Sequence, residues 1–99
     1  MRKAYTVEEL KTLLKNTFYK NKVKKVIVFG SYAKGEAHPK SDIDLCVESD
    51  LRGLSFISLI EDIRDVLKID PDVVRMSEVI ENSRLANEIK RDGVVIYEG

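Results

Sequence analysis

The segment VIVFGSYAKGEAHPKSDIDLCV, residues 26–47, decides how this chain folds. It begins with four β-branched or aromatic residues, apolar on both faces of a strand and followed by Gly30, which predicts a central strand over 26–29. From Asp42 onward polar and apolar residues alternate, which predicts a second strand over 42–47. The connection is short for a parallel crossover, which takes roughly a dozen residues or more, so we expect a mixed sheet containing an antiparallel pair.

Helical patterns lie on both sides of the first predicted strand. Thr6 followed by Glu9 forms a capping-box pattern, and apolar residues then recur at helical spacing, which predicts a helix from about Thr6 to about Tyr19. Between the two strands we expect Ser31 to Lys34 to form a short helix, whose free N–H groups would point toward the end of the first strand.

The rest of the chain alternates helix and strand patterns in the same way. Ser55 and Ser77 are each expected to begin a helix, and the second of these helices should stop before Gly93. Strands are expected over 69–76, near the sheet edge because this run contains a proline, and over 94–97. The pattern predicts an α/β fold in the order α-β-α-β-α-β-α-β, with a small mixed sheet of about four strands and helices packed on it.

Length and composition limit the classes of protein. Ninety-nine residues, 43% hydrophobic and 34% charged, suffice for one folded domain, and we expect residues 1–99 to form a single domain. No apolar run approaches the roughly 18 residues of a membrane span, and the first residues lack the apolar segment of a signal peptide, so we expect a cytoplasmic protein without a membrane partner. One cysteine and one histidine argue against a zinc cluster, so any metal should be held by carboxylates.

Charge is divided unevenly along the chain. Residues 1–40 carry a formal charge of +7 and residues 41–99 a charge of −7, which we interpret as complementarity between two halves that pack together. Four lysines within residues 20–25 could bind nucleic-acid phosphates. Cations at the end of a helix favour its dipole, and no aromatic residues are interleaved with these lysines, so nucleic acid is not the expected partner.

The end of the first strand and the start of the second have residues suited to a phosphate and a metal. Gly30 lets the backbone approach a ligand closely, and a helix beginning at Ser31 would present N–H groups to a phosphate. Asp42 and Asp44 share one strand face with Cα atoms roughly 6.6 Å apart, so they could bridge two magnesium ions about 3.5 to 4 Å apart. A P-loop is excluded, because Glu and Ala occupy its Lys and Ser/Thr positions, and no Gly-x-Gly dinucleotide motif occurs.

A Gly-Ser pair at 30–31, ten residues, and Asp-x-Asp at 42–44 resemble the signature of the polymerase-beta-like nucleotidyltransferase superfamily. In its short length and element order the chain resembles the minimal nucleotidyltransferases of that superfamily, the MNT or MntA-type antitoxins. The resemblance implies a third carboxylate on a later strand, in a segment like Pro71–Val74, which is carried over to Asp72. Asp70 remains the alternative, because on a regular strand it faces the same way.

The resemblance also implies an activity and a partner. It implies a magnesium-dependent enzyme that transfers AMP from ATP to a tyrosine of a HEPN-type toxin, in a type VII toxin-antitoxin system, and releases pyrophosphate. Asp42 and Asp44 would then bind two Mg²⁺ ions, and Asp72 would hold the ion that activates the incoming hydroxyl group or would accept its proton.

For the nucleotide, the resemblance implies that Gly30 and Ser31 hold the β- and γ-phosphates of ATP and that Lys34 adds positive charge. Two other functions stay open at this point. One is a non-catalytic antitoxin that blocks its partner by binding alone, and the other is a nucleotidyltransferase for a small acceptor such as an aminoglycoside.

Overall fold

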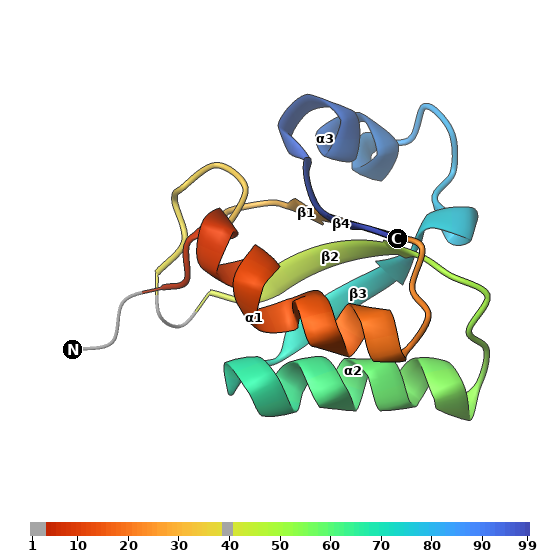
Figure 1. The fold of residues 1–99 in the computed structure, drawn as a ribbon. Helices are drawn as coiled ribbons and strands as arrows, with labels where there is room; N and C mark the ends of the chain where they lie inside the picture. Colours follow the sequence, from red (N-terminus) through yellow and green to blue (C-terminus); the bar gives the residue numbers. More distant parts are fainter. Residues whose placement is uncertain (1–3, 39–40) are drawn as a thin grey trace.

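A computed structural model describes residues 4–38 and 41–99, so the part of the expected loop at residues 39–40 lies outside the described residues. The described residues contain the following elements, in chain order (Figure 1): α1 (Val7–Lys20), β1 (Lys25–Phe29), β2 (Ile43–Glu48), α2 (Leu54–Leu67), β3 (Pro71–Arg75), the 3₁₀ helix η1 (Met76–Glu78), α3 (Arg84–Asp92) and β4 (Val94–Glu98). Within these two ranges, no helix has both the length and the apolar character needed to cross a membrane.

The strands form one mixed sheet in the order β3-β2-β1-β4. β1 pairs antiparallel with both β2 and β4, and β2 pairs parallel with β3. The α/β class and the antiparallel pair at the first connection are therefore confirmed. β3 lies at the sheet edge, where the proline at its first residue is tolerated because no neighbouring strand needs its missing N–H group.

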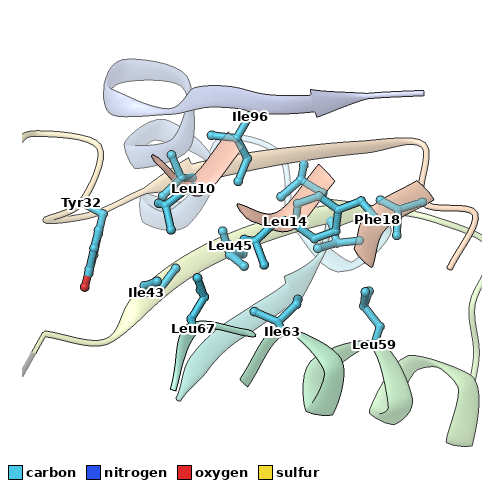
Figure 2. Packing of buried hydrophobic residues seen from close by; sticks show 14 of the residues in the cluster. Leu10, Leu14, Phe18, Tyr32, Ile43, Leu45, Leu59, Ile63, Leu67 and Ile96 are labelled. Atoms are coloured by element: carbon cyan, nitrogen blue, oxygen red, sulfur yellow. The ribbon is translucent and has the colours of Figure 1, made fainter. Parts of the chain in front are cut away.

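The helices lie on both faces of the sheet, α1 and α2 on one face and α3 on the other (Figure 1). The main core lies between the sheet and the first two helices, whose fully buried side chains recur at the spacing of an amphipathic helix (Figure 2). These side chains are Leu10, Leu14 and Phe18 of α1 and Leu59, Ile63 and Leu67 of α2.

The sequence predicts α1 correctly but not the short helix at 31–34. Thr6 and Glu9 exchange the two hydrogen bonds of a capping box at the start of α1. Residues 31–34 form turns, closed by backbone hydrogen bonds within residues 30–36. Four residues are too few for a stable helix, and the side chain of Tyr32 is buried in the main core, which holds the segment in its turn conformation (Figure 2).

The two later helices begin at other residues than those predicted. Gly53 rather than Ser55 precedes α2, and the hydroxyl group of Ser55 donates a hydrogen bond to the carbonyl oxygen of Arg52 at 2.7 Å. Ser83 rather than Ser77 caps α3, accepting a hydrogen bond from a backbone N–H group of the helix at 3.1 Å, and Ser77 lies in η1. A serine hydroxyl bonds nearby backbone groups in caps and in turns alike, so the sequence pattern does not distinguish these serines.

Ion pairs join the basic first half of the chain to the acidic second half. Among the described residues, these are Lys20–Asp62 at 3.6 Å, Lys24–Asp50 at 3.1 Å and Lys34–Asp92 at 3.9 Å. Two of the lysines in the basic cluster at residues 20–25 are thus paired with carboxylates of the same chain, in agreement with the interpretation of the charge division as internal complementarity. Each exposed pair contributes little to stability.

Leu14→Ala is expected to lower the free energy of unfolding by about 3 kcal/mol, because the fully buried side chain leaves a cavity when it is shortened. The matched control Leu13→Ala shortens a neighbouring side chain that is 43% exposed, and should cost less than about 1 kcal/mol. Urea denaturation followed by far-ultraviolet circular dichroism measures both variants. Equal losses would contradict the placement of the core.

Candidate active site

The register of the sheet brings two of the predicted acidic residues side by side. Asp44 in β2 is paired with Asp72 in β3 on one side and with Phe29 in β1 on the other. Side chains at paired positions point to the same face and neighbouring strands lie about 4.8 Å apart, so the two carboxyl groups are adjacent. Ile43 and Leu45 belong to the main core, so Asp44 faces the opposite side of the sheet, the side on which α3 lies (Figure 1).

Gly30 brings the turn after β1 into contact with Asp44. Its φ is +70°, a left-handed conformation that side chains other than glycine rarely adopt. A Cβ atom at Gly30 would overlap the Oδ2 atom of Asp44. Glycine is therefore required twice here, by the backbone conformation and by the carboxylate beside it. The predicted phosphate-binding turn and the predicted metal-binding acid are in direct contact.

The carboxyl group of Asp44 lies among other negative charges. Its pKa is raised from 3.8 to about 6, first by burial, then by the charges of Asp72, Glu88 and Asp42, and also by a side-chain hydrogen bond with Asp72. Such a group is stabilised either by a proton or by a bound cation. The arrangement therefore favours cation binding next to the turn at Gly30.

The other predicted acids occupy more open positions. Asp42 lies one residue before β2 and is exposed, and Asp72 is exposed on the edge strand β3. Asp70, the alternative to Asp72, precedes β3, and its Oδ1 atom accepts a hydrogen bond from Nε of Arg64 at 2.7 Å. The structure thus brings Asp72 to Asp44 and directs Asp70 toward α2.

The predicted nucleotide-binding residues divide into two groups. Gly30 touches Asp44, and Ser31 follows it in the same turn with a half-buried side chain. Lys34 lies further along, and its Nζ atom is 3.9 Å from an Oδ2 atom of Asp92 at the end of α3. Lys34 therefore extends toward α3, and the turn as a whole connects the acidic residues to that helix.

The donor chemistry fits magnesium, which prefers oxygen ligands. Asp44 and Asp72 place two carboxyl groups together. In the part of the chain that the structure describes, however, no three His, Cys, Asp or Glu side chains are grouped so that they could hold a metal ion by themselves. Magnesium sites commonly use one or two carboxylates together with substrate phosphates and water. The residues present therefore fit an ion that shares its ligands with a phosphate group.

Glu88 of α3 is an acidic residue of this site that the sequence does not single out. It is half-buried, and its charge raises the pKa of Asp44. The apolar residues Leu85, Ala86 and Ile89 indicate which face of this helix is buried, but no local pattern indicates that Glu88 lies near Asp44. Only the packing of α3 beside the acidic residues assigns Glu88 to the site.

Comparison with known proteins identifies relatives of this chain. The family model described as Polymerase beta, Nucleotidyltransferase matches residues 8–99. The Methanocaldococcus jannaschii protein named "Putative protein adenylyltransferase MJ0128" is 34% identical over 97 aligned residues, which cover 92% of this chain and 98% of that protein. A second protein of that organism, "Putative protein adenylyltransferase MJ1379", is 31% identical over 99 aligned residues with the same coverage.

Solved structures share the fold. A chain described as "Structure of putative minimal nucleotidyltransferase" has a TM-score of 0.73 and 26% identity, over 91% of this chain and 95% of that one. A chain of "Crystal structure of the toxin-antitoxin with AMP-PNP" has a TM-score of 0.75 and 22% identity, over 90% and 73% of the two chains. A chain from a complex of a tri-AMPylated Shewanella oneidensis HEPN toxin with an MNT antitoxin has a TM-score of 0.69 and 18% identity, over 95% and 74%. At these identities, the last two show a likeness of fold alone.

Gly30→Ala is expected to lower the free energy of unfolding by about 2 kcal/mol or more, because it adds overlap with Asp44 to the strain of a positive φ. Gly35→Ala is the matched control. Its φ of +72° is nearly the same, but no atom lies within 4 Å of the added Cβ atom, so it should cost only about 1 kcal/mol of strain. Urea denaturation measures the difference, and equal costs would refute the contact between the turn and the carboxylate.

Asp44→Asn is expected to stabilise the protein at pH 7 and to change its stability little at pH 3.5, with a chelator present. The folded chain holds the Asp44 proton more tightly than the unfolded chain does, since the pKa is about 6 rather than 3.8. The contribution of Asp44 to the free energy of unfolding therefore falls as the pH rises through this window, and the variant lacks this loss, on the order of 2 kcal/mol. Urea denaturation across the pH range measures the effect. Asp65→Asn, which removes an exposed carboxylate of α2, is the control, and identical pH profiles for the two variants would contradict the prediction.

Proposed function

The chain belongs to the polymerase beta nucleotidyltransferase family, and we propose that it is a protein adenylyltransferase that transfers AMP from ATP to a tyrosine of a HEPN-type toxin. The observation that carries the proposal is the position of Asp44, between the Gly30 turn and Asp72. A nucleotidyl transfer needs a phosphate-binding turn and cation-binding carboxylates at one place, and the contact between the Gly30 turn and Asp44 supports the assignment of these two roles to them.

In the proposed reaction, the tyrosine oxygen attacks the α-phosphorus of ATP and forms a new P–O bond. The bond between the α-phosphorus and the oxygen that links it to the β-phosphate breaks, and pyrophosphate leaves with the electron pair of that bond. Gly30 and Ser31 hold the β- and γ-phosphates, which fixes the leaving group in line with the attack. Asp72, at the exposed edge of the sheet, is open to the incoming hydroxyl group and accepts its proton or holds the ion that activates it.

The carboxylates Asp42, Asp44 and Asp72 hold two Mg²⁺ ions in this proposal, completed by phosphate oxygens and water. When bound by these residues, Mg²⁺ would supply charge neutralisation at the triphosphate and would favour ionisation of the attacking hydroxyl group. The pKa of Asp44 is raised first by burial and then by the neighbouring acids, and it supports this role because a bound cation stabilises the ionised carboxylate against both effects. The protein contributes mostly positioning and charge neutralisation.

Two kinds of similarity support the choice of acceptor. Relatives at 34% and 31% identity are named as protein adenylyltransferases, and chains of the same fold come from complexes of MNT antitoxins with HEPN toxins, one of them tri-AMPylated. One structure of this fold was solved with the ATP analogue AMP-PNP, which supports an adenine nucleotide. With residues 1–99 acting as one domain, the protein would neutralise its toxin in the cytoplasm.

The transfer is tested with ATP labelled at the α-phosphate, Mg²⁺ and a HEPN-domain toxin as the protein partner. Label should appear on a tyrosine of that protein, and each of Asp42→Asn, Asp44→Asn and Asp72→Asn should reduce labelling by roughly 100-fold or more, since cation-assisted charge stabilisation contributes several kcal/mol. Mass spectrometry of the labelled protein identifies the modified residue.

Asp70→Asn is the matched control, because Asp70 lies two residues from Asp72 but is bonded to Arg64. It should keep at least half of the labelling. A partner that stays unlabelled while the wild-type chain still neutralises it, with the three aspartate variants equally effective, would favour an antitoxin that acts by binding alone. Labelling of aminoglycosides instead of the protein would favour a small acceptor.

A further inference from the structure

A hollow of about 570 Å³ lies between the turn after β1 and helix α3, and its arginines have no role assigned so far. It is lined by Lys34, Arg84, Asn87, Glu88 and Arg91. The four α3 residues are spaced by three or four positions, so they lie on one face of the helix. Lys34 comes from the turn, so this hollow is formed by two separate segments of the chain.

The hollow adjoins the acidic residues. Asp44 faces the side of the sheet on which α3 lies (Figure 1), and Glu88 of that helix lines the hollow. Gly30, four residues before Lys34, touches Asp44 from the other direction. A molecule bound at the Gly30 turn with its reacting end at the acids therefore has this hollow beside it.

The charge of the hollow differs from that of the acidic residues next to it. Its lining carries three cations and one anion. Asp92 holds two of the cations in place, with Lys34 at 3.9 Å and Arg91 at 2.9 Å. The side chains of Lys34 and Arg91 are 40% and 68% exposed, and ion pairs of such exposed groups are weak. These cations are therefore positioned by Asp92 but remain available to a stronger anion.

We propose that Arg84 and Arg91 of α3, together with Lys34, bind the β- and γ-phosphates of the nucleotide and then the pyrophosphate product. The assignment rests on the proposed function, in which the α-phosphate lies at the acids. Gly30 and Ser31 carry no charge, so fixed cations on the side of the leaving group would add to the neutralisation that Mg²⁺ supplies at the aspartates. Arginine suits this task because its guanidinium group donates paired hydrogen bonds to phosphate oxygens.

The test measures binding by isothermal titration calorimetry with an ATP analogue that has a methylene group between the α- and β-phosphates, so that no transfer occurs. With Mg²⁺ present, Arg84→Ala and Arg91→Ala should each raise the Kd for the analogue about tenfold, as expected for the loss of a hydrogen bond between charged groups. The Kd for AMP, which lacks the two outer phosphates, should change less than about twofold. Inorganic tripolyphosphate should compete with the analogue for the wild type and compete more weakly for the variants.

Lys90→Ala is the matched control, because it removes an exposed cation from the same helix that does not line the hollow. It should leave every Kd within about twofold of the wild type. Arg91→Gln, which keeps most of the side chain, should behave like Arg91→Ala, and thermal unfolding of each variant verifies that α3 is intact.

Three outcomes contradict the assignment and leave the proposed function standing. Unchanged Kd values for the analogue in both arginine variants would do so directly. Equal losses of affinity for AMP and for the analogue would place the arginines near the nucleoside rather than near the outer phosphates. Normal nucleotide binding with lost transfer to the protein partner would make this face of α3 a docking surface for that partner. A wild-type chain that binds neither ATP nor the analogue would instead refute the proposed function, and the assignment with it.

Discussion

Asp44 is held between the backbone of Gly30 and the carboxyl group of Asp72, and the rest of the site depends on this contact. It brings a partly buried negative charge against a turn that only glycine can form and beside a second acid. The raised pKa of Asp44 shows that this arrangement is unfavourable for the ionised group. Perturbed pKa values of this kind are typical of functional sites. There the fold holds a charged group in an unfavourable environment, and a bound ligand compensates for it.

The surrounding structure maintains the contact through the sheet and its main core. Leu45, next to Asp44 in sequence, is fully buried under α1 and α2, and so the alternation along β2 turns Asp44 toward the other face. Tyr32 is buried in the same core and anchors the turn that begins at Gly30 (Figure 2). One layer of the molecule thus supplies stability, and the opposite face of the same strands carries the acids.

The opposite face is covered by α3, which contributes charge more than apolar packing. Phe29, Cys46 and Ala86 are buried outside the main core, and burial raises the pKa of the Cys46 thiol, which keeps it an unreactive packing group. The polar face of α3 adds an acid next to Asp44 and arginines beyond it. One short helix therefore both covers this face of the sheet and places charged side chains beside the acids.

The sequence by itself determined the elements whose signals are local. Hydrophobic periodicity predicted the strands and α1. The Gly-Ser and Asp-x-Asp spacing indicated Gly30, Asp42 and Asp44 as candidate site residues. The sequence could not choose between Asp70 and Asp72, because residues two apart on a strand share a face. The parallel register of β2 and β3 places Asp72, and not Asp70, beside Asp44. Tertiary structure also decided the turn at 31–34, through the burial of Tyr32, and the role of Glu88, through the packing of α3. These features depend on contacts between residues far apart in the chain, which no local pattern encodes.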